Sequence, residues 1–265
     1  MVAIIQRNWR MYRRYFPIGL FFNRILGTTY TIIGVWLIAV FLFEEEILYS
    51  KSSFIGDTTY FTYAVVGILF YSLAVATLMN VGRALITEVR EGTLISLLLT
   101  PYNVLSYFFG VFVEQVWRTL LEFLILLIVS LFLGAELWHI SVGNWLLGIS
   151  FTLFVCFCMS IFLANIMLQM RDTYISQNTL FIFISFLCGI TFPREILPSG
   201  LRVIGAFVPV TQSLEVFRIL CFMPGNHSVL PKLIATGMVS ASLYFLLGIV
   251  WYKKTERKII SYIFE

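Results

Sequence analysis

Residues 84–101 read ALITEVREGTLISLLLTP and lie between two long apolar stretches of the chain. Charged side chains occupy the first half of this segment, leucines fill the second half, and Pro101 closes it. Acidic residues early, leucines late and a final proline are typical of a short amphipathic helix that lies along a membrane surface. The segment is therefore predicted to be a surface helix whose polar edge contacts another protein.

The composition of the chain predicts an all-α integral membrane protein. Of its 265 residues, 60% are hydrophobic, 17% are aromatic and only 12% are charged, whereas about a quarter of the residues of soluble proteins are charged. The net charge of +4 is too small to indicate nucleic-acid binding. The basic residues cluster beside apolar stretches, where anionic lipid head groups would meet them. Membrane lipid is therefore an expected partner, and nucleic acid is not.

Six apolar stretches have about the ~20 residues that a transmembrane helix needs. They lie at about 18–43, 61–83, 103–133, 143–169, 174–192 and 230–252. Six spans put both termini on one side of the membrane. The segments on that side hold eleven basic residues, which are Arg7, Arg10, Arg13, Arg14, Arg83, Arg90, Arg171, Lys253, Lys254, Arg257 and Lys258. The opposite segments hold five, so the positive-inside rule places both termini and residues 84–101 in the cytoplasm.

The start of the chain is predicted to lie on the membrane surface. In residues 4–16, IIQRNWRMYRRYF, arginines recur on one side of a helical wheel and large apolar side chains on the other. This pattern favours an interfacial amphipathic helix within residues 1–17, with the arginines at the lipid phosphates. The alternative is a positively charged flank of the first span.

Residues 193–220 are hydrophobic, but their prolines exclude one straight spanning helix. Pro193, Pro198 and Pro209 interrupt the segment, and a proline inside a helix removes a hydrogen bond and clashes with the preceding turn. Two short helices that dip into the outer leaflet fit this pattern. Irregular backbone at that depth has to be covered by protein or line a water-filled cavity, so the segment is predicted to form an outer vestibule or gate. Glu215 and Arg218 lie one turn apart on its second helix.

The third apolar stretch carries three charged residues. Glu114, Arg118 and Glu122 follow one another at spacings of four, which places them on one face of a helix with Glu before Arg in the favourable order. A charge at bilayer depth costs at least ~2.5–3.5 kcal/mol, so these side chains are expected to face protein or water. Two interpretations stay open: an ion ladder that fixes this helix to its neighbours or to a partner chain, or a lining of a translocation path.

The four cysteines are expected to be buried free thiols. Cys156, Cys158, Cys188 and Cys221 lie in or beside apolar stretches, without the C-x2-C pairs or nearby histidines of zinc sites. No metal site is predicted. A disulfide between Cys188 and Cys221 is the alternative, because both lie near the predicted outer face.

The order of these segments resembles the ABC type-2 exporter permeases. The matching stretches are Glu91-Gly92-Thr93-Leu94 through Thr100-Pro101 with Gly110 after it, Arg171-Asp172, Gly189 to Pro193, Leu197-Pro198, and Pro209-Val210-Thr211 running to Arg218. The resemblance covers nearly the whole chain, and it implies a single permease domain over residues 1–265 in the plasma membrane, the inner membrane of a bacterium. The hairpin before the last span resembles that of the drug and natural-product exporters.

In that family the cytoplasmic helix after the second span is a coupling helix that contacts a separate ATPase subunit. By resemblance, coupling is expected of Glu88, Glu91, Gly92, Thr93 and Leu94, and outer gating of residues 193–220. The expected assembly contains two permease chains, identical or similar, and two ATPase chains.

The chain itself has no G-x-x-x-x-G-K-[ST] loop, which is the loop that would bind ATP phosphates. It is therefore not expected to be an enzyme or to hold a cofactor, and ATP and Mg are expected on the partner. The expected function is export of a hydrophobic or amphiphilic molecule, such as a drug, an antibiotic, a peptide or a lipid.

Three other functions are weighed against export. An ion-coupled secondary transporter tends to carry ionisable residues at midplane and paired broken helices, but here only the third span is charged. An intramembrane enzyme would need a motif such as H-E-x-x-H or G-x-S-x-G, and the chain has neither. The third is a sensor or immunity protein that keeps the permease fold without transporting.

Overall fold

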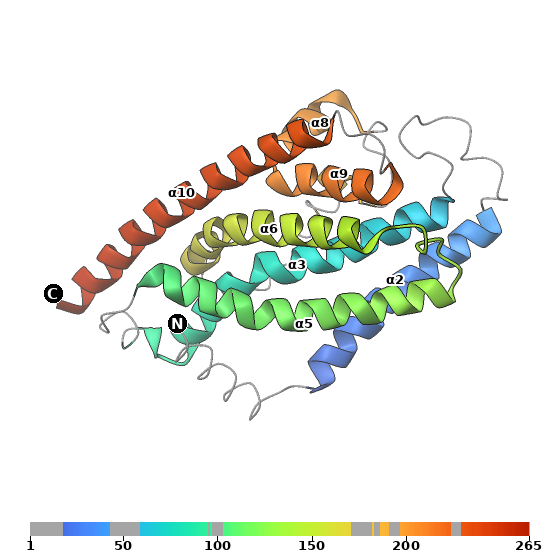
Figure 1. Cartoon of the computed structure of the whole chain (residues 1–265). Coiled ribbons are helices and arrows are strands. Elements are labelled where there is room, and N and C mark those ends of the chain that lie inside the picture. Colours follow the sequence, from blue (N-terminus) through green and yellow to red (C-terminus); the bar gives the residue numbers. More distant parts are fainter. Residues whose placement is uncertain are drawn as a thin grey trace.

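The computed structural model describes residues 18–42, 59–94, 96, 103–170, 182, 186–190, 197–223 and 229–264. Within these ranges the chain forms helices and no strand (Figure 1). The helices are α2 (Ile18–Leu42), α3 (Tyr60–Arg90), α5 (Val104–Phe132), α6 (Val142–Met170), α8 (Ser199–Ala206), α9 (Pro209–Phe222) and α10 (Leu230–Phe264). The all-α prediction is therefore confirmed for the described part of the chain.

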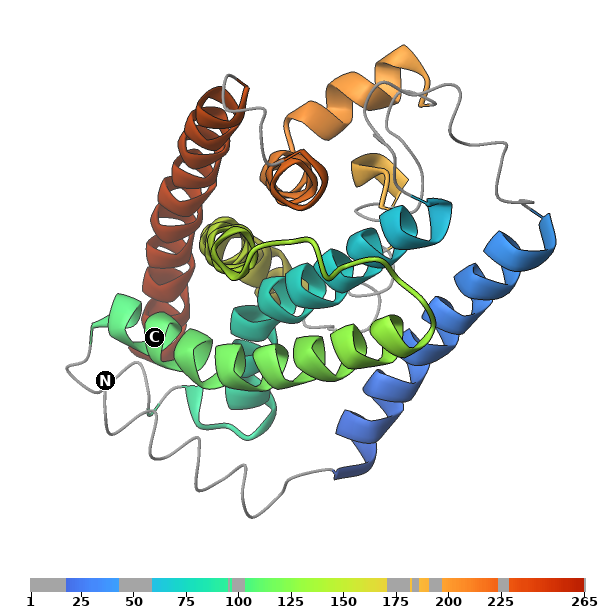
Figure 2. The same ribbon diagram turned by 45° about the vertical axis from the view of Figure 1, so that its right-hand side comes forward.

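Helix α3 is the centre of the bundle. It contacts α2, α5, α6 and α9, and Figure 2 shows it running between α5 and α6. Leu69, Phe70, Leu73 and Leu78 along its length are fully buried. A helix that is apolar on all sides is stable only inside a protein or a membrane. The composition of α3 thus explains why the other helices pack around it.

Four of the described helices are long and apolar enough to cross a membrane, namely 60–90, 104–132, 142–169 and 230–257. The described apolar part of α2 is shorter and spans Ile25–Phe41. Of the predicted span 174–192, the structure describes residues 182 and 186–190, whereas Pro193 and the predicted interfacial helix at 1–17 lie outside the described residues. The described residues thus show four of the six predicted spans at full length.

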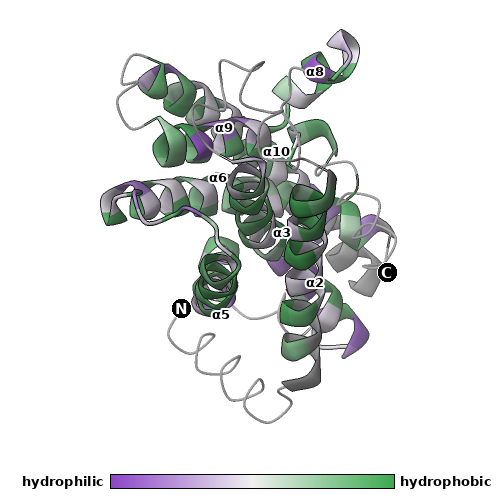
Figure 3. Cartoon of the chain, turned by 90° about the vertical axis from the view of Figure 1, so that its right-hand side faces the viewer, coloured by the Kyte–Doolittle hydropathy of each residue, from purple (hydrophilic) through white to green (hydrophobic). Residues whose placement is uncertain are grey.

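The outward sides of the helices are hydrophobic, as Figure 3 shows. Trp117, Phe132, Leu146 and Val250 are each more than half exposed. Soluble proteins rarely expose contiguous apolar surface on this scale, whereas lipid chains cover such faces in a membrane. The described structure therefore has the surface of a multi-pass membrane protein.

The bundle has two distinct ends. Helix α3 finishes, α5 begins, and α6 and α10 finish at one end, which we call the turn end after the turn that follows Arg90 (Figure 1). The opposite end contains α8 and α9, and we call it the hairpin end. At the hairpin end, the Thr62 hydroxyl accepts from the Glu136 N–H at 3.1 Å, and the Asn144 amide donates to the Leu220 carbonyl at 2.9 Å. These bonds fix the loop after α5 to α3, and α6 to α9.

The sequence predicts a separate surface helix that begins at residue 84, and this prediction is wrong. Residues 84–90 continue α3, because Leu85 and Ile86 are buried and extend its apolar face. Gly92 follows with φ +69°, a backbone conformation that costs other L-residues about 1–2 kcal/mol, and the helix ends there. Within the rest of the segment, residues 95–101, only residue 96 is described.

The two short helices expected within 193–220 are present as α8 and α9, which meet at an angle of 93°. Pro198 is the N-cap residue of α8, and Pro209 is the first residue of α9. A proline is tolerated at the first helical position because its missing N–H has no partner there in any helix. The prolines thus begin these helices instead of interrupting them. The role of this hairpin at the membrane stays a prediction.

Candidate functional site

At the turn end, the buried carboxylate of Glu88 joins α3 to α5. Glu88 is 5% exposed. One of its oxygens accepts from the Thr93 hydroxyl at 2.5 Å, and the other accepts from the Tyr107 hydroxyl at 3.4 Å. The Thr93 N–H also donates to the Glu88 carbonyl at 3.0 Å. Because a buried carboxylate is costly without hydrogen bonds, these two hydroxyls stabilise Glu88 in place and hold the turn against α5.

Leu94 anchors the same turn through apolar packing. It is 7% exposed and belongs to a cluster with Leu85, Tyr107, Phe108 and Tyr252. The Phe108 and Tyr252 rings meet edge to face with centroids 5.0 Å apart. The turn after α3 is therefore packed against α5 and, through Phe108, against α10.

The five residues expected to couple to a partner thus fall into two groups. Glu91, Gly92 and Thr93 are exposed, whereas Glu88 and Leu94 are buried within the chain. The buried pair positions the turn, and only the exposed group is accessible to another protein. Spacing along α3 could have revealed that Glu88 is buried, because position 88 continues the stripe of the buried residues Val81 and Leu85. Tyr107 has no such sequence signal.

At the hairpin end, the guanidinium of Arg218 on α9 joins three separate parts of the chain. One of its nitrogens donates to the Ile190 carbonyl at 2.6 Å. Its central carbon lies 4.1 Å from the centroid of the Tyr63 ring on α3. A cation over an aromatic face is attracted by the ring, by about 2 kcal/mol when it is desolvated. We call Arg218, Tyr63 and the Ile190 carbonyl the Arg218 cluster.

Gly67 makes the Arg218 cluster possible. A Cβ atom at this position would lie 2.0 Å from the Ile190 oxygen and 3.1 Å from the Arg218 guanidinium. Only a glycine lets the backbone at Ile190 come this close to α3. Two residues before Ile190, the Cys188 thiol lies 3.3 Å from the Thr211 hydroxyl of α9. Residues 188–190 are thereby held between α3 and α9.

The predicted outer-gate residues have different roles in this region. Arg218 lies at the centre of the cluster, and Pro209 is buried at the start of its helix. Glu215 lies one turn before Arg218 and is half-buried, while Pro198 is exposed at the start of α8. Tyr63 and Ile190 were not identified from the sequence, because nothing local relates them to position 218.

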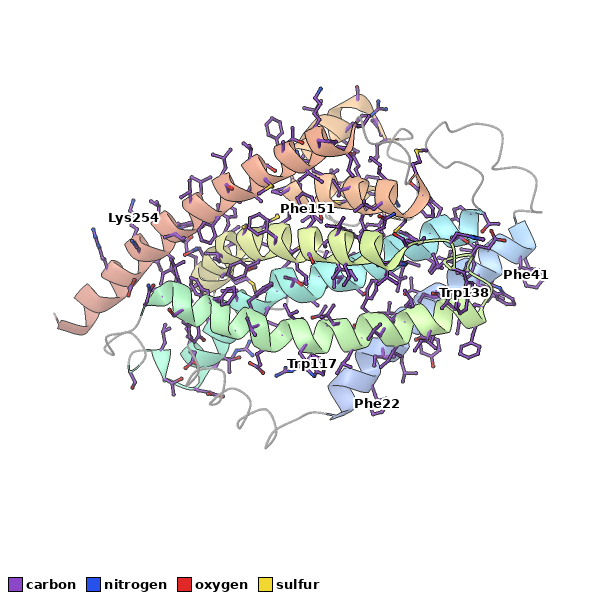
Figure 4. All side chains as sticks on the ribbon, in the orientation of Figure 1. Phe22, Phe41, Trp117, Trp138, Phe151 and Lys254 are labelled. Carbon is purple, nitrogen blue, oxygen red and sulfur yellow. The ribbon has the colours of Figure 1, made fainter. Side chains whose placement is uncertain are left out.

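The charged residues of α5 lie on one face, as their spacing predicts. Arg118 forms an ion pair with Glu114, and their side chains are 16% and 10% exposed. Glu122 is buried one turn further on. Trp117, labelled in Figure 4, is 59% exposed on the outer side of α5. The first two charges thus neutralise each other within the helix, and a lining of a translocation path stays a prediction.

The four cysteines are free and buried. The alternative of a disulfide between Cys188 and Cys221 is therefore wrong. The physical reason is that the Cys188 thiol is directed at Thr211, which lies ten positions before Cys221 on the same helix. Among the described residues, no group of three His, Cys, Asp or Glu side chains is placed to hold a metal ion.

A family model described as "ABC-2 type transporter" matches residues 1–222. The matched region includes the turn after α3, the charged face of α5 and the Arg218 cluster. No curated protein matches the chain.

Proposed function

The chain belongs to the ABC-2 type transporter family, as a transmembrane subunit, and from this we propose that it exports a hydrophobic or amphiphilic molecule from the cytoplasm or the inner leaflet. The energy would come from ATP hydrolysis on a separate ATPase chain, because the sequence has no P-loop. ATP and Mg would bind to that partner. Two permease chains, identical or similar, and two ATPase chains form the assembly that we propose, in the plasma membrane.

The observation that carries this proposal is the geometry of the turn after α3. Glu91, Gly92 and Thr93 are exposed at the end of the central helix, while Glu88 and Leu94 attach the turn to α5 and its neighbours. A protein that pushes on the exposed residues therefore pushes on α3 and α5 together. Rigid-body movement of packed helices is a common way to transmit such a push.

The distribution of basic residues supports the orientation. The end of α10 carries Lys253, Lys254, Arg257 and Lys258 in sequence, and the last turn of α3 carries Arg90. Both helices finish at the turn end. Because Lys and Arg accumulate on the cytoplasmic side of membrane proteins, we place the turn end and both termini in the cytoplasm.

The Arg218 cluster would then lie at the outer side, where it supports the gating role of the hairpin. It holds residues 188–190, α3 and α9 together through one half-buried side chain. If the outer side opens to release substrate, these contacts are the ones that have to rearrange. Arg218 is therefore the residue that we assign to the closed state of the outer gate.

The charges on α5 favour one other function, an ion-coupled secondary transporter, because ionisable groups inside a membrane often mark ion paths. A sensor or immunity protein would keep the same fold and ATPase without transport. Export that requires ATP, measured in vesicles with the reconstituted complex, separates the proposed function from both.

The first test is co-purification in mild detergent, with two variants that make the same charge change at opposite ends of the bundle. Glu91 is exposed at the turn end, and Glu136 is exposed at the hairpin end. We expect an ATPase with a P-loop to co-purify with the wild type and with Glu136→Lys, and to be lost with Glu91→Lys. If Glu91→Lys keeps the ATPase, the turn is not the coupling site.

A further inference from the structure

A cavity of about 620 Å³, open on its outer side, lies between α6 and α10, near the turn end. Phe162 and Gln169 line it from α6, and Leu247, Trp251, Lys254 and Thr255 line it from α10. Its volume falls within the ~300–1,000 Å³ of typical small-ligand sites. None of the residues named in the turn after α3 or in the Arg218 cluster lines this cavity.

The lining of the cavity is graded from apolar to polar. Helices α6 and α10 run in the same direction, from the hairpin end to the turn end (Figure 1). On both helices the apolar lining comes first and the polar lining follows, as Phe162 precedes Gln169 on α6 and Leu247 precedes Lys254 on α10. At ~1.5 Å per helical residue, the change takes place over about 10 Å. The cavity thus has an apolar part inside the membrane and a polar part at its surface, which is the polarity of an amphiphile.

The walls of the cavity are held in place by contacts between the two helices. The Phe162 ring meets the Trp251 ring edge to face at 5.4 Å. The Asn165 amide donates to the Gly248 carbonyl at 3.0 Å, and Asn165 is fully buried. Packing and hydrogen bonds thus fix the walls beside Phe162 and Trp251, and a ligand would not have to separate the helices in order to enter.

The charge at the polar end selects the class of ligand. Lys254, labelled in Figure 4, is exposed and lines the cavity. Around it the sequence Lys253-Lys254-Thr255-Glu256-Arg257-Lys258 contains four basic residues and one acid. Anionic lipid head groups are attracted by such juxtamembrane basic segments, and each basic residue contributes to the attraction. An anionic head group therefore fits this end better than a zwitterionic or cationic one.

We propose that this cavity is a binding site for one anionic phospholipid. The phosphate lies at Lys254, with Gln169 and Thr255 at the level of the head group, and an acyl chain follows Phe162, Leu247 and Trp251 into the membrane. In the orientation proposed above, the lipid belongs to the cytoplasmic leaflet. The bound lipid bridges α6 and α10, and its binding requires neither ATP nor the transported substrate.

The test is native mass spectrometry of the purified chain after delipidation, titrated with phosphatidylglycerol or with phosphatidylcholine. Lys254→Gln removes the basic group in the cavity, and Lys253→Gln makes the same change at the neighbouring exposed residue, which does not line it. We expect one phosphatidylglycerol per chain, with affinity lowered about five-fold in Lys254→Gln and lowered less in Lys253→Gln, whose charge acts only from outside the cavity. Phosphatidylcholine should bind more weakly, with no difference between the variants.

A second variant tests the apolar part of the site. Leu247 is 58% exposed and lines the cavity, so Leu247→Trp adds volume there without disturbing the helix packing. It should lower the binding of both lipids while the thermal unfolding midpoint stays the same. Equal losses in Lys253→Gln and Lys254→Gln, or no loss in Leu247→Trp, would overturn the proposal. Because the titration contains neither ATPase nor substrate, its failure leaves the export proposal untouched.

Discussion

At the scale of single residues, the hairpin end depends on the absence of one Cβ atom. Gly67 on α3 leaves room for the Ile190 carbonyl, and that carbonyl accepts the hydrogen bond from Arg218. Glycine in a helix costs about 0.5–1 kcal/mol relative to alanine. At this position, the hydrogen bond and the ring contact that it permits offset that cost.

The first prediction concerns this glycine. Gly67→Ala should destabilise the protein by about 1–3 kcal/mol, because the added methyl group overlaps a backbone oxygen that has little freedom to move. The matched control is Gly34→Ala on α2, where a Cβ would meet nothing within 4 Å; there the higher helix propensity of alanine applies. The thermal unfolding midpoint in detergent should fall for the first variant and stay equal or rise for the second. Equal midpoints in both variants would show that Ile190 does not hold this position.

At the scale of elements, α5 is a helix with one apolar face and one charged face. Its outer face is apolar, with Trp117 exposed, and its inner face carries Glu114, Arg118 and Glu122. The helix is the first long described element after the turn that follows α3, and the Tyr107 hydroxyl near its start donates to Glu88. Whether the charges on its inner face are structural or belong to a path can be decided by a double-mutant cycle.

The second prediction is that this cycle shows strong coupling. Arg118→Met alone should lower the free energy of unfolding by about 3–5 kcal/mol, because it leaves the largely buried Glu114 carboxylate without its cation. Adding Glu114→Gln removes that charge and should restore most of the stability, measured as the unfolding midpoint of each variant. If the double variant also restores ATP-dependent export, the ion pair is structural. If stability returns but export does not, the pair lines the path.

At the scale of the whole molecule, the two ends of the bundle have different polar centres and are predicted to face different compartments. The turn end exposes Glu91, and the hairpin end exposes Glu136. The four native cysteines are at most 8% exposed, so they should react slowly with water-soluble thiol reagents. A single cysteine introduced at either end can therefore report the orientation against a low background.

The third prediction uses a membrane-impermeant maleimide on intact cells. Glu136→Cys should be labelled from outside, and Glu91→Cys should be labelled only after the membrane is permeabilised. The wild-type chain, with its native thiols, is the control and should give little labelling in either case. The opposite pattern would invert the orientation and exclude residues 91–93 as a contact for a cytoplasmic ATPase.

The sequence by itself determined the features that depend on composition and short spacing. Its hydrophobicity established the membrane class, Pro209 marked the start of α9, and the spacing of four placed Glu114 and Arg118 in contact. These features are local, because a helix brings positions i and i+4 together in any surroundings. The predicted boundary at residue 84 was wrong, since buried Leu85 and Ile86 extend α3 to Arg90.

Only the tertiary structure decided which side chains from distant parts of the chain meet. The Glu88 carboxylate contacts Tyr107 across a turn, Arg218 lies over Tyr63, and Phe162 meets Trp251 at the cavity wall. A helical pattern shows which face of a helix is apolar, but it does not show which neighbour covers that face. The packing of whole helices settles that choice, because many residues have to be buried at the same time.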